Sequence, residues 1–501
     1  LDFGWLGWVA LVPLLLAMRG CPPSTAGGLG LIAGITASFG IYGWLFEVPN
    51  FDLRHAVVLA FYVGSYPAVW AASTAWLSAR RVPLTIAAPT LWLVMDYVRA
   101  HAGFLALPWG TLAQTQHLNL AFLQTATLFG EHGLTSLVAT GNAALAGLLL
   151  RQERLSAALA LILVAVAHVW GFAELQESAS QRPLSIAAIQ PNIQIEERQT
   201  EAGRANNLAR LERLTREASA GSPFLIVWPE SAIPGDLADP ALRARIQVLV
   251  DETGIPLMLG AAEVEKFSTG EGPVTMGRHA FNTAHLFRPG ERPAKPYRKR
   301  VLVPFAEYLP HPDVIPWPEW LAPRVMELTP GDETPLFLVT SGLSVGPLIC
   351  WENLFAPLAR ESVNDGANVL VQLTNDVWFG RSAAPWQHNL MSVMRAAENR
   401  TPIVIASNSG PSQLVDGHGR VVATTGRMFA EGYAIGTVAA GTGGTLYTTW
   451  GDSVLLILLI PLLLYWYGVW ARSWLSRPIT SPAITLSRVS QSTRKTEEVA
   501  R

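Results

Sequence analysis

The sequence is poor in charge. Only 15% of its 501 residues are Asp, Glu, Lys or Arg, whereas soluble proteins average roughly 25%. This deficit argues against a wholly soluble protein. It is also uneven, because residues 1–172 contain 13 charged residues and residues 173–450 contain 52. The contrast predicts a membrane part followed by a soluble part.

Cysteine is nearly absent. The two cysteines, Cys21 and Cys350, lie far apart, which excludes a disulfide framework and makes a cysteine in the soluble part a candidate nucleophile.

The ten histidines show no metal-ligand spacing, so we expect no metal site and no cofactor. A net charge of −2 gives no basic footprint for nucleic acid. No pattern predicts an oligomeric state.

Long apolar runs dominate the first third of the chain. Runs near the roughly 20 residues that cross a bilayer lie at 3–18, 26–46, 56–78, 83–99, 133–150 and 155–172, with a seventh at 454–470. The first run lacks a cleavage pattern, so it is interpreted as a span, and an earlier helix is expected to be missing. Within the spans, Gly30 and Gly34 form a GxxxG spacing, for which chance is the favoured explanation because glycine is common in membrane helices. Asp96 and Arg99 are interpreted as reaching the interface rather than as functional charges.

Basic residues in the short loops predict the orientation of these spans. If the chain starts outside, the inside loops and tail contain Arg19, Arg80, Arg81, Arg151, Arg154, Arg472 and Arg477, and the outside connections contain only Arg54 and Arg99. We therefore expect an inner-membrane protein with its soluble part in the periplasm. The predicted parts are membrane helices in 1–172, a periplasmic domain in 173–450, a C-terminal membrane helix in 451–472 and a disordered cytoplasmic tail in 473–501.

The soluble part alternates short β-branched runs with polar helical stretches. Strands are expected at 184–189, 224–227, 256–259, 283–287, 345–349, 369–373 and 403–406. Helices are expected at 198–218, 241–252, 354–363 and 386–398. This alternation predicts a layered α/β domain with a largely buried sheet.

Three predicted strands end in reactive or polar residues. They lead into Glu230, into Cys350 with Glu352, and into Asn375 with Asp376. In layered α/β folds, ligand sites gather beyond the carboxyl ends of strands. These side chains are therefore candidates for one shared site.

Lys299 adds a cation to this set, and it is one of only four lysines in the chain. Four of these candidate side chains fit nucleophilic acyl transfer, namely Cys350, Glu230, Lys299 and Glu307. Cys350 would attack a carbonyl, Glu230 would take the thiol proton, and Lys299 would stabilise the oxyanion with Glu307 in support. From the residues alone, a cysteine at a strand end is more often a small buried hydrophobe, and Lys299 between two arginines also fits a solvated loop.

The ordered motifs resemble the nitrilase superfamily. They are Gln190-Pro191-Asn192, Trp228-Pro229-Glu230, Phe281-Asn282-Thr283, Lys299 with Leu302-Val303-Pro304-Phe305, Cys350-Trp351-Glu352 and Asn375-Asp376. The resemblance implies an αββα sandwich and a Glu230, Lys299, Cys350 triad. With the membrane spans, Leu107-Pro108-Trp109 and the run Asp376 to Gly380, the chain resembles the apolipoprotein N-acyltransferases over nearly its whole length. Departures are Ala306 for the usual Gly, Trp351 for the common Tyr, Asp96 for the frequent Glu, and seven spans for eight.

That family resemblance implies a two-step reaction. A phospholipid acyl donor would load Cys350 as a thioester, and the N-terminal amine of a diacylglyceryl-cysteine apolipoprotein would accept the acyl chain. Within the motifs, Trp351, Glu352 and Asn375 are candidate supporting residues beside Glu307. Candidate substrate-binding residues are Trp109, Trp378 and Phe379.

Two rival functions stay open. One is a membrane-anchored amidase that hydrolyses a small amide, and the other is a lipid-binding or structural membrane protein with an inactive nitrilase-like domain. The apolar stretch 311–333 is interpreted either as a lid at the membrane or as an Ω-loop packed on the domain. His388 and His418 have no carboxylate partner visible in the sequence and are predicted to be structural.

Overall fold

The computed structural model of the chain describes residues 3–151, 153–176, 182–233, 237–264, 280–321 and 327–456, and further positions 459, 463, 464, 467, 468, 470 and 471. Residues Leu1–Leu455 form one compact unit and Leu456–Arg501 a second. Everything below concerns the first unit. The predicted tail 473–501 lies outside the described residues, as do much of the seventh predicted span and part of the stretch 311–333.

The first part of the chain is helical. Its elements are η1 (Gly4–Trp8), α1 (Val12–Ala17), α2 (Pro23–Tyr42), η2 (Gly43–Glu47), α3 (Leu53–Ser78), α4 (Leu84–Ala100), η3 (Gly103–Leu105), η4 (Ala113–Gln116), α5 (Leu120–Leu123), α6 (Ala126–Leu149) and α7 (Arg154–Glu174). Within the described residues, three helices are long and apolar enough to cross a membrane, namely Pro23–Glu47, Leu53–Ser78 and Arg154–Glu174.

The helix α6 lies inside this helical part. It packs against α1, α4 and α7 and, on the other side, against helices of the α/β part. Because its neighbours cover it, α6 carries polar residues that lipid would not tolerate. Asn142 is fully buried, donates to the carbonyl of Gly7 at 2.9 Å and accepts from the amide of Leu11 at 2.8 Å. It thereby satisfies the backbone where the first apolar run breaks between η1 and α1.

The helices α2 and α3 meet at the GxxxG glycines. A Cβ atom on Gly30 would lie 2.4 Å from the carbonyl oxygen of Pro67, and one on Gly34 would lie 2.7 Å from the Cα of Gly64. Such distances are far inside normal contact, so only glycine allows the two backbones to come this close. The expectation that this spacing arose by chance is therefore wrong.

The charged pair in α4 is buried rather than directed to the interface. Asp96 accepts from Arg99 Nη2 at 3.0 Å, and its other oxygen lies 3.1 Å from His132 Nδ1 on α6. Arg99 Nη1 also donates to the carbonyl of Trp109 at 3.1 Å. This corrects the interpretation that Asp96 and Arg99 extend toward the membrane surface, because both find partners inside the helical part.

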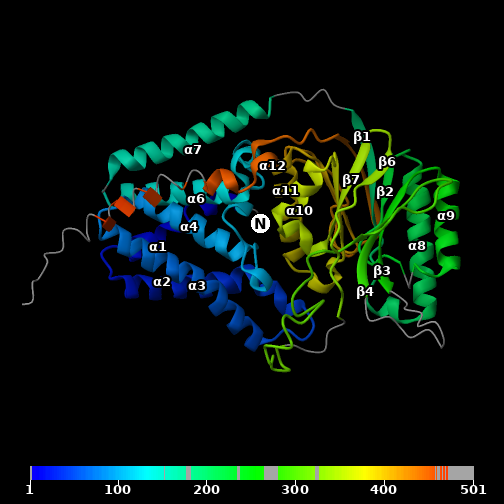
Figure 1. The fold of residues 1–501 in the computed structure, drawn as a ribbon, viewed down its shortest axis with the longest axis horizontal. Coiled ribbons are helices and arrows are strands. Elements are labelled where there is room, and N and C mark those ends of the chain that lie inside the picture. The colour runs from blue at the N-terminus through cyan, green and yellow to red at the C-terminus, as the bar shows by residue number, and fades with distance from the viewer. Residues whose placement is uncertain are drawn as a thin grey trace, which may run out of the picture. The chain divides into compact units, whose positions relative to one another are not determined.

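The second part is built on two six-stranded sheets (Figure 1). Its strands are β1 (Pro183–Gln190), β2 (Leu225–Val227), β3 (Leu257–Val264), β4 (Ala280–Phe287), β5 (Tyr297–Arg298), β6 (Phe337–Thr340), β7 (Leu343–Ile349), β8 (Val369–Thr374), β9 (Ile403–Ser407), β10 (Gln413–Val415), β11 (Val421–Thr424) and β12 (Gly432–Ala439). The first sheet has the order β12-β1-β2-β3-β4-β5 and the second β11-β10-β9-β8-β7-β6. All seven predicted strands are present, whereas β5, β6, β10, β11 and β12 were not predicted.

The two sheets pack face to face, and apolar side chains of both fill one core. The helices α8 (Glu201–Ser219) and α9 (Pro240–Thr253) cover the outer face of the first sheet. The helices α10 (Ala356–Asn364) and α11 (Ala384–Asn399) cover the second sheet. This arrangement is an αββα sandwich and confirms the predicted fold class (Figure 1).

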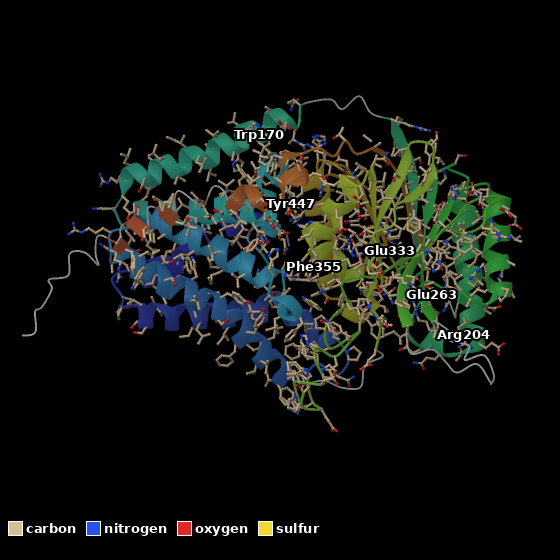
Figure 2. All side chains as sticks on the ribbon, in the orientation of Figure 1. Trp170, Arg204, Glu263, Glu333, Phe355 and Tyr447 are labelled. Carbon is tan, nitrogen blue, oxygen red and sulfur yellow. The ribbon has the colours of Figure 1, made fainter. Side chains whose placement is uncertain are left out.

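The layer formed by α10 and α11 also faces the helical part, and the side-chain view shows Phe355 and Tyr447 at this boundary (Figure 2). One apolar cluster contains residues of α6, of α11 and of the strands β8 and β9. The ring of Tyr447, from α12 (Leu446–Trp450), lies against Gly130, where α6 kinks with a φ of +63°. The helical part and the sandwich therefore share a continuous core.

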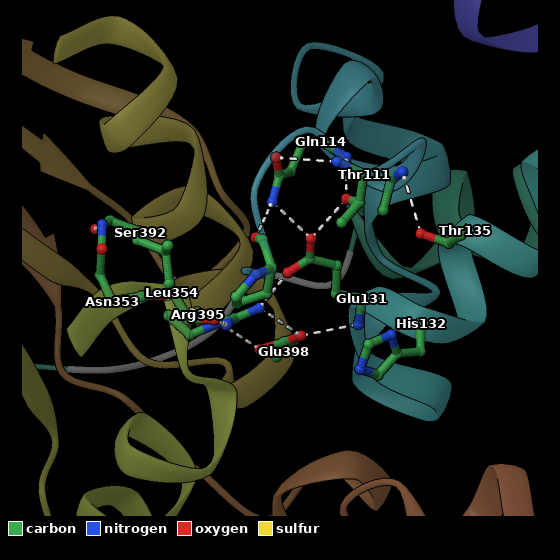
Figure 3. A network of polar contacts seen from close by, with 12 residues as sticks. Thr111, Gln114, Glu131, His132, Thr135, Asn353, Leu354, Ser392, Arg395 and Glu398 are labelled. Atoms are coloured by element: carbon green, nitrogen blue, oxygen red, sulfur yellow. Dashed lines mark hydrogen bonds and ion pairs between the residues drawn. The ribbon is translucent and has the colours of Figure 1, made fainter. Parts of the chain in front are cut away.

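A buried polar network crosses this boundary (Figure 3). Arg395 Nη2 on α11 donates to Glu131 Oε2 on α6 at 2.7 Å and to Glu398 Oε1 at 3.0 Å. The amide of Glu131 donates to Glu398 Oε1 at 2.8 Å. Glu131 Oε1 also accepts from Thr111 at 2.6 Å and from Gln114 at 2.8 Å. Two carboxylates from different parts of the chain thus share one guanidinium.

Candidate active site

The candidate triad lies where strands of both sheets end. Glu230 follows β2, and Lys299 follows the short strand β5 of the same sheet. Cys350 follows β7 of the second sheet and begins the short helix η6 (Cys350–Leu354). The sandwich therefore brings together side chains that are up to 120 residues apart in the sequence.

Lys299 is the centre of the charged group. Its side chain is 1% exposed, and its Nζ lies 2.8 Å from Glu307 Oε1 and 3.9 Å from Glu230 Oε1. Its amide donates to the carbonyl of Asn282 at 2.8 Å, which fixes the backbone beside β4. Asn282 Nδ2 in turn donates to Glu230 Oε1 at 2.7 Å. Three of the predicted residues, Glu230, Lys299 and Glu307, thus form one buried cluster.

Charges control the protonation of this cluster. Burial alone would lower the pKa of Lys299, but the neighbouring Glu307, Cys350 and Glu230 raise it above its ordinary value. The ammonium form is therefore strongly favoured. Burial raises the pKa of Glu230, with Lys299 acting in the opposite direction. A carboxylate of raised pKa is a stronger base than a solvated one, which suits proton abstraction near neutral pH.

Cys350 has an unusual backbone conformation. Its φ of +51° lies in the left-handed region, which costs a non-glycine residue of order 1–3 kcal/mol and often marks a functional site. Burial, together with the charge of Glu230, raises the pKa of its thiol well above the ordinary value, while Lys299 lowers it. The resting sulfur is therefore a thiol rather than a thiolate. Such a thiol needs a base at the moment of attack, and Glu230 is coupled to it electrostatically.

Glu352 holds the turn behind the nucleophile. It is fully buried and accepts hydrogen bonds from the Tyr297 hydroxyl at 2.8 Å and from the amides of Ile349 at 2.8 Å and Arg300 at 2.6 Å. Burial raises the pKa of Glu352, although these hydrogen bonds oppose the shift. One carboxyl group therefore joins the end of β7 to the segment that carries Lys299.

Trp351, the residue after Cys350, belongs to a cluster of aromatic side chains. The Trp351 ring lies 6.2 Å from the buried ring of Trp109, nearly parallel to it. Phe379 contacts Trp44 edge to face at 4.8 Å, and Trp44 also lies 5.0 Å from Trp109. Trp378 is 46% exposed. The helical part thus contributes Trp44 and Trp109 to an apolar wall next to the nucleophile.

The described part of the stretch 311–333 packs against the helical part. Trp317 donates to the carbonyl of Pro310 at 2.6 Å, and its ring lies 6.2 Å from that of Phe104 in η3. Trp320 contacts His55 near the start of α3 at 5.5 Å. These contacts place tryptophans of the sandwich beside the ends of apolar helices.

Asn375, a predicted supporting residue, contacts a different part of the fold from the triad. It is buried and accepts a hydrogen bond from Asn408 Nδ2, in the loop after β9, at 2.9 Å. Glu131, Arg395 and Glu398 join the two parts of the chain, and no sequence pattern marked Glu131 as their partner. Asn282 lay within a quoted motif, but only the fold shows that it holds Glu230.

His388 is buried and both of its ring nitrogens lie near polar partners, which agrees with the structural role predicted for it. Its Nδ1 lies 3.0 Å from Asp376 Oδ1, so it does have a carboxylate partner. The two residues are 12 apart, and the sequence could not show that a loop and a helix bring them together. His418, by contrast, contributes its backbone carbonyl to Gln124 at 3.0 Å.

Both parts of the chain resemble known protein families. The carbon-nitrogen hydrolase family matches residues 185–446, and the apolipoprotein N-acyltransferase N-terminal domain matches residues 1–144. The apolipoprotein N-acyltransferase of Geobacter metallireducens is 34% identical over 467 residues, 89% of this chain and 87% of the relative. The chain belongs to the apolipoprotein N-acyltransferase family. A further family member, from Gloeobacter violaceus, is 31% identical over 90% of this chain and 87% of that protein.

Membership of the apolipoprotein N-acyltransferase family makes the chain an acyltransferase with a nitrilase-like domain and a membrane protein. Among solved structures, an amidase from Nesterenkonia sp. is 20% identical, with 51% of this chain and 90% of that chain covered and a TM-score of 0.37. Among the described residues, no three His, Cys, Asp or Glu side chains are grouped to hold a metal ion.

Proposed function

We propose that the protein transfers a fatty acyl chain from a membrane phospholipid to the N-terminal α-amine of diacylglyceryl-cysteine apolipoproteins, through a thioester on Cys350. The observation that carries the proposal is the Lys299 ammonium, which lies between two carboxylates and interacts electrostatically with Cys350, in a chain with three helices long enough to cross a membrane. Both substrates are lipids, so the helical part gives the site access to them.

In the first step, Cys350 Sγ attacks the ester carbonyl of the phospholipid and its proton passes to Glu230. The oxygen of the tetrahedral intermediate becomes negative and is stabilised by Lys299, a contribution of about 3–4 kcal/mol for one donor in comparable sites. The carbon–oxygen bond then breaks, and the lysophospholipid oxygen takes the proton from Glu230. The acyl chain remains on sulfur as a thioester.

In the second step, the lipoprotein amine attacks the thioester carbonyl and gives a proton to Glu230. The carbon–sulfur bond breaks, an amide forms, and Cys350 regains the proton. Glu307 keeps Lys299 in place through both steps, since it forms the shorter of the two contacts to Nζ. The apolar wall of Trp351, Trp109 and Phe379 suits the acyl chain.

The proposed placement is the bacterial inner membrane, crossed several times, with the catalytic domain in the periplasm. Arginines in the loops assigned to the cytoplasm support this orientation. We keep the four parts 1–172, 173–450, 451–472 and 473–501 as the proposed organisation.

Product analysis tests the proposal against the amidase alternative. The purified protein is incubated with phosphatidylethanolamine in mixed micelles, with and without a synthetic diacylglyceryl-cysteine peptide. A transferase yields N-acyl peptide in preference to free fatty acid when the peptide is present. If free fatty acid predominates and no acyl peptide forms, the transfer function is wrong and a hydrolase is favoured.

A further inference from the structure

His388 lies directly behind the nucleophile. It is on α11, its side chain is 1% exposed, and its Nε2 lies 3.2 Å from the carbonyl oxygen of Cys350. Its Nδ1 lies 3.0 Å from Asp376 Oδ1. Asp376 receives hydroxyl hydrogen bonds from Ser407 at 2.7 Å and from Thr374 at 3.1 Å. The histidine thus joins a buried carboxylate to the backbone of Cys350.

Both ring nitrogens of His388 face hydrogen-bond acceptors. A neutral imidazole has one N–H group, so it can donate either to Asp376 or to the carbonyl of Cys350, but not to both. The two contacts are hydrogen bonds together only when the ring carries both protons. Gln372 Nε2 donates to the Cys350 oxygen at 3.4 Å and also lies 3.4 Å from His388 Nε2. His388 Nε2, at 3.2 Å, is the closer of the two nitrogens to that oxygen.

We propose that His388, doubly protonated and paired with Asp376, is a positioning residue that fixes the backbone of Cys350 for attack. The proposal rests on the proposed function, in which Cys350 is the nucleophile. The left-handed conformation of Cys350 is costly, and a charged donor to its carbonyl is among the stronger hydrogen bonds that can hold it.

The direction of that carbonyl has a consequence for the reaction. In a planar trans peptide, the N–H of Trp351 points opposite to the carbonyl of Cys350, and therefore away from His388. Trp351 lies in the first turn of η6, where N–H groups have no partner within the helix. By donating to the carbonyl, His388 both orients this peptide and polarises its N–H group. That N–H is then available to the oxyanion beside Lys299.

The helical part supports His388 in this position. The ring of Trp109 lies parallel to the imidazole at 5.9 Å, and its Nε1 donates to Gln387 at 2.9 Å. The carbonyl of Trp109 accepts from Arg99 at 3.1 Å and from Tyr42 at 2.8 Å. An aromatic face stacked on a protonated imidazole stabilises its charge. The position of the nucleophile is thereby linked to the membrane helices.

Two substitutions of His388 separate its contacts. His388→Asn keeps an amide near the Nδ1 position and loses the contact to Cys350, whereas His388→Gln places an amide near the Nε2 position and retains a donor. The measurement is the single-turnover rate of Cys350 acylation by phosphatidylethanolamine, followed by intact mass as donor concentration is varied. We expect His388→Asn to be at least about tenfold slower with an unchanged half-saturating donor concentration, and His388→Gln to recover much of that loss.

Matched controls keep the outcomes distinct. His418→Asn removes a histidine of the same domain whose backbone contact to Gln124 is retained, and it should acylate at the wild-type rate. Acylation that persists in Cys350→Ala would overturn the proposed function itself. The positioning role of His388 is overturned by either of two results in a protein that still requires Cys350. In the first, folded His388→Asn is acylated within twofold of the wild-type rate. In the second, His388→Asn and His388→Gln are acylated at the same rate. If His388→Asn does not fold, His388→Gln is compared with His388→Leu. Faster acylation by Gln supports the proposal and equality overturns it.

Discussion

In the helical part, the buried carboxylate of Asp96 lies between two basic side chains, with Arg99 at 3.0 Å and His132 at 3.1 Å. In the sandwich, the buried ammonium of Lys299 lies between two carboxylates, with Glu307 at 2.8 Å and Glu230 at 3.9 Å. The residue types are alike, but the ratio of acid to base is reversed. Where bases outnumber carboxylates, the group ties helices together. Where carboxylates outnumber bases, one carboxyl group can take up and release a proton, as acyl transfer requires.

The network at the boundary has the acid-to-base ratio of the active site. Arg395 serves both Glu131 and Glu398. Burial, opposed by Arg395 and reinforced by Glu131, raises the pKa of Glu398 to about 7. An excess of buried carboxylates over cations therefore raises the pKa of a carboxyl group at the boundary as well as in the active site. What distinguishes the active site is the thiol placed beside the shifted carboxyl group.

Removing the cation from the active site is expected to have the largest effect. Lys299→Met leaves the buried Glu230 and the partly buried Glu307 without their ammonium and the oxyanion without its charge, so acylation of Cys350 should slow by about 10³-fold. Single-turnover intact-mass kinetics measure the rate. Lys295→Met is the matched control, since Lys295 is exposed and pairs with Glu333 on the surface. If Lys299→Met acylates at the wild-type rate, the ammonium between the two carboxylates has no role in acyl transfer, and the contrast with the helical part fails.

Removing the cation at the boundary is expected to affect stability. Arg395→Met leaves Glu131 and Glu398 buried without a cation, which should cost about 3–5 kcal/mol in the free energy of unfolding. Denaturant unfolding in detergent measures the loss. Arg213→Met, which removes exposed ion pairs with Glu217 and Glu431, should cost less than about 1 kcal/mol. Equal losses in the two variants would show that the boundary network is no more important than surface pairs.

Replacing Glu398 with a neutral side chain should reduce the dependence of protein stability on pH. The folded-state pKa of Glu398 is about 7 and its ordinary value is 4.5. The folded protein therefore binds more protons than the unfolded chain between these values, and its stability falls as pH rises through this range, by at most about 3 kcal/mol. Glu398→Gln should flatten this decline, measured as unfolding temperature from pH 4.5 to 7.5. An unchanged slope in Glu398→Gln would assign the dependence to other groups.

The helical part should respond most weakly, and through packing rather than charge. Gly30→Ala introduces a Cβ 2.4 Å from the Pro67 carbonyl, so α2 and α3 must separate, at a cost of about 1–3 kcal/mol. Gly28→Ala on the same helix meets no atom within 4 Å and should leave the unfolding temperature unchanged or higher. Should both variants behave alike, the close contact of these helices would not be a source of stability.

The sequence predicted those features that leave a local mark. Glu230, Cys350 and Glu307 each follow an apolar run and Lys299 comes shortly before one, and the fold class follows from the alternation of strands and helices. The seven predicted strands were found because they are buried and apolar. The strands β5, β6 and β10 to β12 were missed because they are short or half exposed, and pairing with neighbours makes them strands.

Side-chain contacts between elements that are distant in the sequence could not be predicted. Whether Asp96 reaches the interface or an internal partner depends on where α6 places His132, and local sequence does not encode that position. The same holds for His388, whose carboxylate partner Asp376 begins the short helix η7 (Asp376–Phe379) after β8. The polar residues of α6, such as Asn142, are explained only by the helices that cover it.

The central claim is that Cys350 carries the acyl chain. The direct measurement is intact mass and peptide mapping of the protein after incubation with phosphatidylethanolamine of defined chain length, in the absence of acceptor. The account predicts one acyl group on the peptide that contains Cys350, present also in Cys21→Ala, which removes the other cysteine of the chain, and missing in Cys350→Ala. An acyl adduct that persists in Cys350→Ala would contradict the account.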